Sequence, residues 1–319
     1  MGSVINGYES IVGQINAELK KPLNDIPLFV NSYYGEDGRF EINTHLNSKV
    51  SEKVQTTIFA HHNRRDNIND KNDDGFLDKP LQNQINFLNK WQYTNPAKGL
   101  VSFLNFKYLD DEKTLGSLLF SQNPKYGSSN WGGEILTKRF DSSFKLGYVN
   151  PNIPYQSIGF QLSYSSHDQD SYYGARIYDI NQKSIFSNII YNTIITNSRN
   201  KIKLGLNYSY DNYDEILSQK NYSDIIRRKD NSTGAFFEYS YDNLEKISLV
   251  AGLRYDIHNN LGSFLTPRFH LRYKPFEKSV FRFSIGSGRK ASNIFSENQE
   301  LFSKGRTIRE FLSVVMFVP

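Results

Sequence analysis

The sequence contains no cysteine, and only 2 methionines and 2 tryptophans occur among its 319 residues. The absence of cysteine excludes disulfide frameworks, thiolate metal sites and cysteine nucleophiles. No run approaches the roughly 20 apolar residues that a membrane-spanning helix needs, which excludes a helical membrane protein. No serine lies in the glycine pattern of a nucleophile elbow. We therefore predict that the chain is not an enzyme.

The charge pattern and the N-terminus also lack familiar signals. The net charge is +5, and lysine and arginine are scattered along the chain. Nucleic-acid binding requires a basic stripe on a recognisable module, so we expect no nucleic-acid partner. The N-terminus has no charged region followed by an apolar stretch, so we expect no secretory signal peptide in this sequence.

Alternation of apolar and polar residues is the dominant pattern, and it is typical of strands whose two faces meet different surroundings. From Lys201 to Asp211, apolar and aromatic residues alternate with lysine, glycine, asparagine and serine. The segment from Leu265 to Lys274 alternates in the same way, with two arginines and a histidine on its polar side. These patterns predict an all-β protein.

We predict about thirteen strands, most of them about ten residues or longer, whereas strands of soluble sheets usually have about five or six. The predicted length matches the roughly 9–11 residues that a tilted strand needs to cross a bilayer. The predicted strands are residues 27–35, 38–47, 52–62, 82–93, 98–109, 131–149, 155–166, 184–196, 200–212, 232–242, 245–258, 264–274 and 279–288.

The connections between these strands alternate in length. Short connections are 47–51, 94–97, 197–200, 242–244 and 275–278, and long polar ones are 63–81, 110–130, 167–183 and 212–231. Short turns at one end and long loops at the other are typical of outer-membrane barrels, whereas a soluble sandwich gives no reason for them. The sequence predicts an incomplete antiparallel transmembrane β-barrel in contact with outer-membrane lipid.

Tyrosines near the ends of the predicted strands support this interpretation, because amphipathic rings favour the level of the lipid headgroups. The alternative is that tyrosine simply favours strands. The tyrosines concerned are Tyr93, Tyr108, Tyr148, Tyr164, Tyr210, Tyr241, Tyr255 and Tyr273.

One loop has the spacing of a calcium site. Oxygen-bearing side chains stand at positions 1, 3, 5 and 9 of an EF-hand-type loop: Asp70, Asn72, Asp74 and Asp78. Gly75 occupies position 6, and the carbonyl of Phe76 supplies a fifth ligand, but position 12 is Leu81 instead of glutamate. The pattern predicts a weak calcium site, the only cofactor we expect, and the alternative is an acidic, solvated loop. His61 and His62 do not share a metal site, because adjacent strand residues point to opposite faces.

The N-terminal stretch from Gly2 to Pro22 contains several glycines but lacks the GxGxxG pattern of a phosphate-binding loop. It resembles the end of the plug domain of TonB-dependent outer-membrane receptors, on the residues Gly2, Ser3, Gly7, Gly13, Ile15 and Asn16. The resemblance implies that residues 17–20 form the strand by which the chain leaves the plug. An ordinary hairpin punctuated by glycine is the alternative.

Two later stretches carry the same resemblance. The segment from Arg282 to Asn298 is similar to a mid-barrel segment of that family, and the stretch Gly252–Asp256 is similar to another part of the barrel. Because the three stretches lie near both ends of the chain and between them, the likeness spans nearly the whole chain, and its character is that of receptors of Bacteroidetes-type bacteria. The resemblance implies uptake of a small-molecule chelate, most often a ferric siderophore, across the outer membrane, with energy passed on by TonB.

The resemblance also gives the polar faces of the strands a role. Five charged residues lie on the polar sides of neighbouring predicted strands: Arg254, Arg268, Arg272, Arg282 and Glu238. In a barrel they line the lumen, where we expect them to pair with the plug and with one another. A path for the substrate is the alternative.

The chain departs from the family in its extent. Family barrels have about 22 strands around a plugged lumen, and a TonB box is absent here. We expect residues 1–22 to be the C-terminal end of the plug, residues 23–306 a partial barrel, and residues 307–319 an aberrant or truncated tail. We further expect a fragment that begins inside a longer gene, with TonB as a partner of the full-length parent.

Other functions stay open at this point. On the same scaffold, the transported ligand is alternatively cobalamin, copper or a glycan. The rival from another class is a secreted β-sandwich adhesin or binding protein.

Overall fold

The computed structural model describes residues 3–9, 26–120, 130–219, 222–291 and 293–298. Thirteen strands account for most of them: β1 (Leu28–Tyr34), β2 (Arg39–Lys49), β3 (Val54–Arg65), β4 (Leu81–Asn95), β5 (Leu100–Gly116), β6 (Gly132–Val149), β7 (Ser157–Tyr173), β8 (Arg176–Ile195), β9 (Asn197–Gln219), β10 (Tyr222–Asp242), β11 (Ile247–His258), β12 (Gly262–Phe276) and β13 (Ser279–Gly286).

The helices of the described chain are short. They are η1 (Val4–Asn6), η3 (Pro96–Lys98) and α1 (Ile294–Glu297). None of these described helices is long and apolar enough to cross a membrane.

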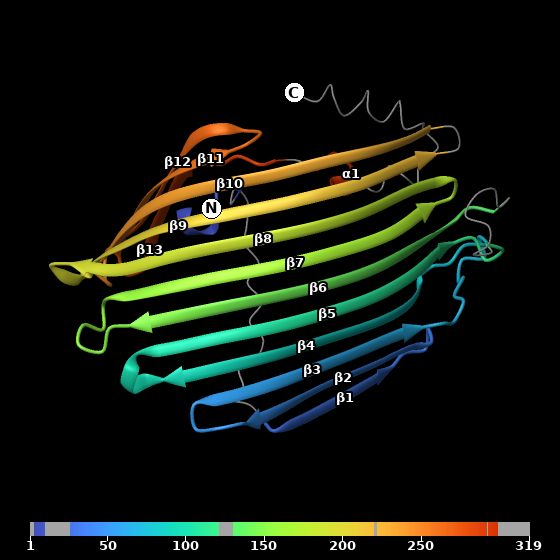
Figure 1. The fold of residues 1–319 in the computed structure, drawn as a ribbon, viewed down its shortest axis with the longest axis horizontal. Coiled ribbons are helices and arrows are strands. Elements are labelled where there is room, and N and C mark those ends of the chain that lie inside the picture. Colours follow the sequence, from blue (N-terminus) through green and yellow to red (C-terminus); the bar gives the residue numbers. More distant parts are fainter. Residues whose placement is uncertain (1–2, 10–25, 121–129, 220–221, 292, 299–319) are drawn as a thin grey trace.

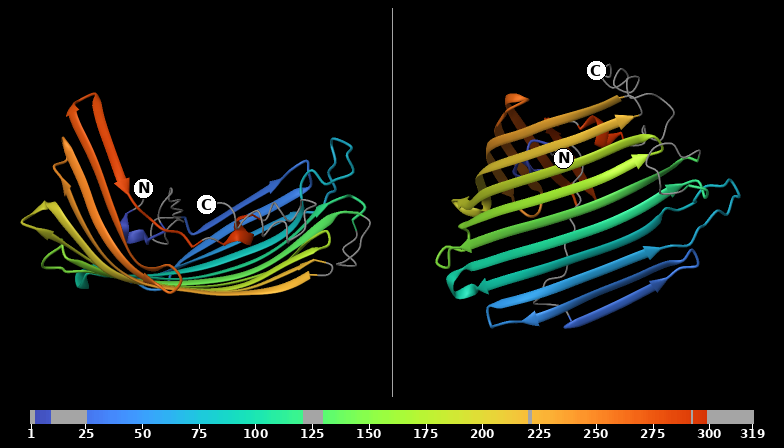
Figure 2. Two further views of the ribbon diagram at one scale, coloured as in Figure 1. Left: turned by 90° about the horizontal axis from the view of Figure 1, so that it is seen from above. Right: turned by 45° about the vertical axis from the view of Figure 1, so that its right-hand side comes forward.

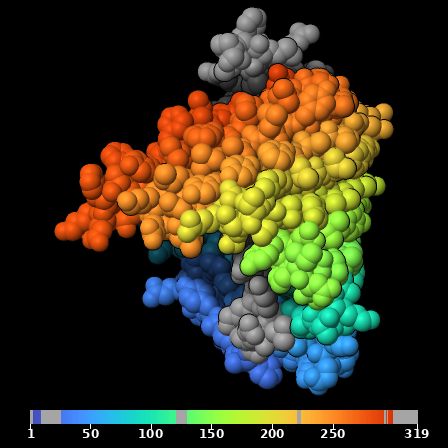
Figure 3. All heavy atoms as spheres, turned by 90° about the vertical axis from the view of Figure 1, so that its left-hand side faces the viewer, coloured from blue at the N-terminus to red at the C-terminus, as the bar shows by residue number. Residues whose placement is uncertain are grey.

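The strands form one antiparallel sheet in which each strand pairs with the next in the sequence, from β1 to β13. Seen from above, the sheet curves into an open trough, with the N-terminal segment and α1 on the concave side (Figure 2, left). In the space-filling view the strands stack in chain order, and β11 to β13 project away from the rest (Figure 3). The prediction of an all-β, incomplete barrel wall of thirteen strands is confirmed.

The two faces of the sheet differ in chemistry, as the alternating sequence predicts. On β9, Leu204 and Leu206 project from the convex face and are exposed, while Asn207 faces the concave side and is buried. On β11, Leu253 and Ile257 are exposed in the same way. An apolar exposed face has no rationale in water but fits contact with lipid hydrocarbon.

The long polar connections predicted between the strands are partly wrong. Residues 167–183 are the ends of β7 and β8 joined by a tight turn at Gly174, whose φ of 62° is left-handed. Residues 212–231 likewise belong mostly to β9 and β10. In both stretches the hydrogen bonds between neighbouring strands continue, but the outward face is no longer apolar. The alternation that signals a strand therefore disappears from the sequence. The loop between β3 and β4 is present but spans residues 66–80, somewhat shorter than the predicted 63–81.

The buried apolar side chains cluster where the N-terminal segment and α1 lie against the concave face. Val4 and Tyr8 from the segment, Phe295 from α1 and Phe236 and Phe264 from the wall are all buried. Elsewhere the described wall is one layer thick, so the only extensive core forms beneath these two short segments. The predicted strand at residues 17–20 and the predicted tail at 307–319 lie outside the described residues.

Candidate functional site

A buried arginine organises the concave face of β9, β10 and β11. Asn207, Gly234 and Asp256 lie side by side in register on these three strands. A Cβ atom on Gly234 would stand only 2.2 Å from the Arg254 Nη2 atom, so the glycine leaves the space that the guanidinium fills. Arg254 donates to both carboxylate oxygens of Asp256, at 2.7 Å and 2.5 Å, and also to the Asn207 side chain. Arg254 and Asp256 are both 0% exposed.

The charged wall residues bind the backbone of the N-terminal segment. Arg254 Nη1 donates to the carbonyl oxygen of Val4 at 3.3 Å. Arg268 on β12 donates to the carbonyl oxygens of Ser3 at 2.9 Å and Gly7 at 3.4 Å. Because a buried guanidinium costs free energy unless its donors are satisfied, these carbonyl groups are part of what keeps the arginines in place.

The side chain of Ser3 completes the polar contact. Its hydroxyl donates to Glu238 Oε2 on β10 and accepts from the backbone N–H of Ile5, which caps η1. The other oxygen of Glu238 lies 3.2 Å from Lys203 Nζ on β9. Glu238 is buried, so the lysine and the serine together balance its charge and its hydrogen bonds.

Packing fixes the same segment. Val4 is fully buried, and its two methyl groups lie 2.8 Å from the position that a Cβ atom on Gly252 would take. Only glycine at this point of β11 therefore allows the valine to lie against the backbone of the wall. The Tyr8 ring makes edge contacts with the His258 and Phe264 rings, at centroid distances of 5.7 Å and 5.5 Å.

The stretch that follows β13 covers the segment from the other side. The backbone N–H of Arg289 donates to the carbonyl of Tyr8 at 3.2 Å, and that of Ala291 donates to Glu9 Oε1 at 3.2 Å. Asn293 in turn donates to Glu215 on β9 at 2.8 Å. The N-terminal segment is thus held between the barrel wall and residues 287–298.

A cavity of about 370 Å³ lies between these three parts. Asn6, Tyr8 and Glu9 line it from the segment, Asp211 lines it from the wall, and Lys290 lines it from the stretch after β13. The lining mixes apolar and polar side chains and carries both signs of charge. The arrangement fixes a piece of chain inside the trough.

Comparison with known proteins identifies the scaffold. Residues 29–304 match the family model described as TonB dependent receptor-like, beta-barrel. This chain belongs to the TonB-dependent receptor family. No curated protein matches the sequence at a significant level.

Solved structures share the fold at low sequence identity. The alcaligin outer membrane receptor FauA from Bordetella pertussis aligns with a TM-score of 0.66 and 12% identity, over 86% of this chain and 46% of that one. The siderophore receptor PiuA from Acinetobacter baumannii gives 0.61 and 11%, over 81% and 48%. The copper transporter OprC gives 0.63 and 13%, over 88% and 46%. The chain therefore spans about half the length of these structures.

Membership of the TonB-dependent receptor family places the chain in the outer membrane, in a family of receptors and not of enzymes. The rival prediction of a β-sandwich is wrong, because the described strands form one continuous sheet and not two packed layers. The particular likeness to Bacteroidetes-type receptors stays a prediction.

The five charged lumen residues predicted from the sequence divide into two groups. Arg254, Arg268 and Glu238 meet the N-terminal segment, as described above. Arg272 and Arg282 lie directly opposite each other across β12 and β13, and they take no part in those hydrogen bonds. Three of the five residues therefore bond to the N-terminal segment, while the ion-pair partners of Arg254 and Glu238 within the wall are Asp256 and Lys203. Pairing with a plug stays a prediction.

The sequence did not identify Asn207 and Gly234 as parts of the site, nor Gly252 as the residue against which Val4 packs. Asp256 was visible as a carboxylate two positions beyond Arg254, on the same strand face. Glycine in a strand signals close approach of another chain segment, so Gly234 and Gly252 carried a usable signal. A glycine does not indicate which segment approaches it, and here the segment lies about 250 positions away in the sequence.

In this receptor-family chain the predicted calcium loop lies between β3 and β4. The Asp70 carboxylate accepts from the backbone N–H groups of Asp74 at 3.2 Å and Gly75 at 2.9 Å. Asp74 accepts from the N–H of Phe76 at 2.9 Å, and Asp78 accepts from the N–H of Lys71 at 2.8 Å. The four side chains therefore shape the turn of the loop. Across the described chain, no three acidic or histidine side chains are placed to hold a metal ion. Calcium binding stays a prediction.

The same loop rests on the turn between β1 and β2. Lys79 Nζ lies 2.8 Å from Asp37 Oδ2, and this hydrogen bond lowers the pKa of Asp37. His61 and His62 nearby face opposite sides of β3, as predicted. His61 contacts Asn43 at 2.7 Å, and His62 contacts Asn83 at 3.1 Å.

Proposed function

We propose that this chain is part of a plugged outer-membrane transporter, and that residues 3–9 are the end of its plug. The hydrogen bonds from Arg254 and Arg268 to the backbone of Ser3, Val4 and Gly7 carry the proposal. An open pore has no use for buried arginines that bind carbonyl groups of a separate segment. A lumen that must be closed and then reopened needs such arginines, because their hydrogen bonds to backbone atoms can break and re-form.

We propose further that the transported substrate is a ferric siderophore, taken up with energy supplied through TonB. The support comes from relatives of similar fold. FauA is named as the receptor for alcaligin, and PiuA is named as a siderophore receptor. The second candidate is copper, favoured by the similar fold of the copper transporter OprC. Cobalamin and glycans are further candidates on the same scaffold.

Uptake by cells that lack the gene for this chain tests the substrate. Cells grown without free iron are supplied with a radioactive ferric siderophore, copper or cobalamin in turn. The proposal expects a selective loss of ferric siderophore uptake, restored by the intact gene. A selective loss of copper uptake, with iron uptake unchanged, would replace the first candidate by the second.

A wall variant tests the plug contact separately. Replacing both Arg254 and Arg268 with alanine removes the donors to the N-terminal segment, while Arg64→Ala on β3 removes an exposed arginine that pairs with Asp66. We expect the double variant to admit large hydrophilic antibiotics that the outer membrane normally excludes, and the control to behave like the unmodified protein. Equal exclusion by both variants would contradict the proposed role of the segment.

A further inference from the structure

The cavity between the N-terminal segment, the wall and the stretch after β13, which we call the inner cavity, lies toward the long loops. Each strand is antiparallel to the next, so β3 and β9 run in the same direction. β3 leads into the long loop 66–80, and β9 therefore runs toward the same side. Asp211 and Tyr213 line the cavity beyond Asn207 in that direction. Long loops of outer-membrane barrels are extracellular, so a molecule from outside reaches the cavity before it reaches Arg254.

The two cations of the inner cavity already have partners. Arg228 lies 2.8 Å from Asp230 on the same strand, and its guanidinium lies over the Tyr213 ring, 4.4 Å from the centroid. Lys290 lies 2.9 Å from Glu297. An incoming anion would therefore have to compete with a carboxylate for either cation.

Two further carboxylates of the inner cavity have no cationic partner. Asp211 accepts hydrogen bonds from the Ser184 hydroxyl and, at 3.4 Å, from the Gln182 amide. Glu9 accepts from the backbone N–H of Ala291 at 3.2 Å. These three donors are neutral, and within the described residues neither carboxylate forms an ion pair. Two negative charges that line the cavity are thus uncompensated.

The Tyr8 hydroxyl is a third group of the inner cavity that a ligand can use. The Tyr8 side chain is only 9% exposed, and within the described chain its hydroxyl forms no hydrogen bond. Burial raises the pKa of Tyr8, and the nearby charges of Glu9, Asp230 and Asp211 raise it further. The phenol therefore stays neutral and lies among carboxylates. A neutral phenol can accept a hydrogen bond as well as donate one.

These groups select a particular kind of ligand. A bare metal ion does not suit the inner cavity, because no three acidic or histidine side chains of the described chain are placed to hold one. A primary ammonium suits it better, since its three N–H donors match three acceptors, Asp211, Glu9 and Tyr8. Phe186 and Ala291 line the same cavity and offer apolar contact to a methylene chain. The volume of about 370 Å³ lies within the roughly 300–1,000 Å³ of small-molecule pockets.

We propose that the inner cavity binds a protonated primary amine carried by the transported chelate. The Asp211 and Glu9 carboxylates and the Tyr8 hydroxyl accept its three hydrogen bonds. This inference rests on the proposed function, uptake of a ferric chelate, and narrows the substrate to chelates with a free alkylamine arm. Because the cavity adjoins the N-terminal segment, the arm is the part of the substrate that contacts the proposed end of the plug.

Binding to the refolded chain tests the inference. The full 319-residue chain in neutral detergent micelles is titrated at pH 7 in a calorimeter. One ligand is ferrioxamine B, a ferric trihydroxamate that ends in a primary amine, and the other is its N-acetylated form, in which an amide replaces the ammonium. We expect ferrioxamine B to bind about tenfold more tightly, as loss of one charge-assisted contact implies. Equal affinities, including no detectable binding of either chelate, would overturn the proposal.

A simple amine tests the source of the ammonium group. We expect n-butylammonium to bind weakly and to compete with ferrioxamine B, because it carries the arm without the chelate. Binding of n-butylammonium together with equal affinities for the two chelates would identify a site for a free amine. That result would overturn the assignment to the transported chelate.

Substitutions of Asp211 and Tyr8 assign the preference to the inner cavity. Asp211→Asn should abolish the preference for ferrioxamine B, and Tyr8→Phe should reduce it while keeping the aromatic ring. Asp211→Lys should reverse it in favour of the N-acetylated chelate, a gain that misfolding cannot produce. An unchanged preference in either Asp211 variant would contradict the assignment.

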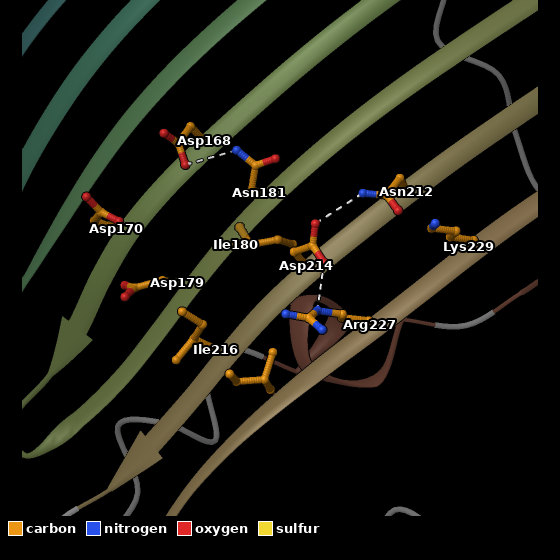
Figure 4. Close-up of a pocket in the computed structure, with 11 residues that line it drawn as sticks. Asp168, Asp170, Asp179, Ile180, Asn181, Asn212, Asp214, Ile216, Arg227 and Lys229 are labelled. Carbon is orange, nitrogen blue, oxygen red and sulfur yellow. Dashed lines mark hydrogen bonds and ion pairs between the residues drawn. The ribbon is translucent and has the colours of Figure 1, made fainter.

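The outward face of the same strand supplies a matched control. Asp214 on β9 lies 3.5 Å from Arg227 on β10 and accepts a hydrogen bond from Asn212 at 3.2 Å (Figure 4). It lines a separate cavity on the convex face and not the inner cavity. Asp214→Asn removes the same charge from β9 and should leave the preference unchanged. Loss of the preference in this variant as well would contradict a role specific to Asp211.

The proposed function and this inference fail in different measurements. If the proposed function is wrong, cells that lack the gene take up ferric siderophores as well as cells that carry it. If only the inference is wrong, uptake of a ferric siderophore still depends on the gene, but the refolded chain does not distinguish ferrioxamine B from its N-acetylated form.

Discussion

At the scale of single residues, two glycines decide where the N-terminal segment can bind. Gly234 leaves room for the Arg254 guanidinium, and Gly252 leaves room for the methyl groups of Val4. Both glycines lie within strands, where a side chain would normally be an advantage. Their value lies in the space they leave, because the charged cluster and the segment both need close approach to the wall.

A substitution at Gly252 tests this reasoning. Gly252→Ala places a methyl group 2.8 Å from Val4, and we expect a loss of about 1–3 kcal/mol, as for other overpacked sites. The free energy of unfolding in detergent micelles measures the loss, and hydrogen exchange at residues 3–7 should become faster. Gly159→Ala on β7 is the matched control, since nothing lies within 4 Å of its added methyl group. A similar loss in both variants would show that strand glycine itself, and not the contact with Val4, sets the stability.

A pair of neighbouring residues on β9 tests the lipid-facing assignment. Leu204 projects from the convex face and is 43% exposed, while Lys203 faces the lumen and binds Glu238. In a membrane-inserted parent barrel, Leu204→Arg should cost about 2–4 kcal/mol, as charges do near the middle of a bilayer. We expect Lys203→Ser to cost clearly less. Denaturant titration of both variants in the same lipid or detergent checks the difference, and equal losses would contradict the assignment.

At the scale of elements, β7 to β10 extend well beyond the apolar part of the wall. β9 has 23 residues and β10 has 21, whereas about 9–11 tilted residues cross a bilayer. Their outer parts stand above the hydrocarbon, where the backbone ladder still forms but the outward side chains are charged. This extension provides the wall behind α1, where the Tyr178 ring of β8 contacts the Phe295 ring.

The loop between β3 and β4 carries the calcium prediction. Its spacing of Asp70, Asn72, Asp74 and Asp78 is right, but Leu81 gives no ligand at position 12, so we expect weak binding at about 10⁻⁴–10⁻³ M. Calorimetry with millimolar calcium on refolded protein should show heat that Asp74→Ala abolishes. Absence of heat, or heat that Asp74→Ala leaves unchanged, would rule out the site and leave the aspartates only the hydrogen bonds that shape the loop.

At the scale of the whole molecule, the open edges of the sheet determine whether the chain can insert into a membrane. In the described chain β1 and β13 each pair with only one strand, so each presents a row of unmet backbone groups. Each such group costs several kcal/mol in hydrocarbon. The convex face also exposes a broad apolar surface, and in water this surface favours aggregation.

We therefore expect this chain alone neither to insert stably into outer-membrane lipid nor to take up ligand. Refolding into liposomes, followed by gel electrophoresis with and without heating, checks the expectation. Migration should not depend on heating, and added protease should digest the strands. Heat-dependent migration together with protease protection would show that the sheet closes or pairs its edges in lipid.

The sequence by itself determined the number of strands, their order and the chemistry of each face. The physical reason is that alternation along a strand depends only on what each face meets, and Leu204 or Leu253 records that surrounding directly. Where both faces of β9 and β10 meet polar surroundings the alternation vanishes, and the strand ends were predicted too early. Only the tertiary structure decided that Val4 lies against Gly252 and that Arg254 binds its carbonyl group. The curvature of the sheet brings residues 250 positions apart, such as Val4 and Arg254, together on the concave face. No local sequence pattern encodes such a contact.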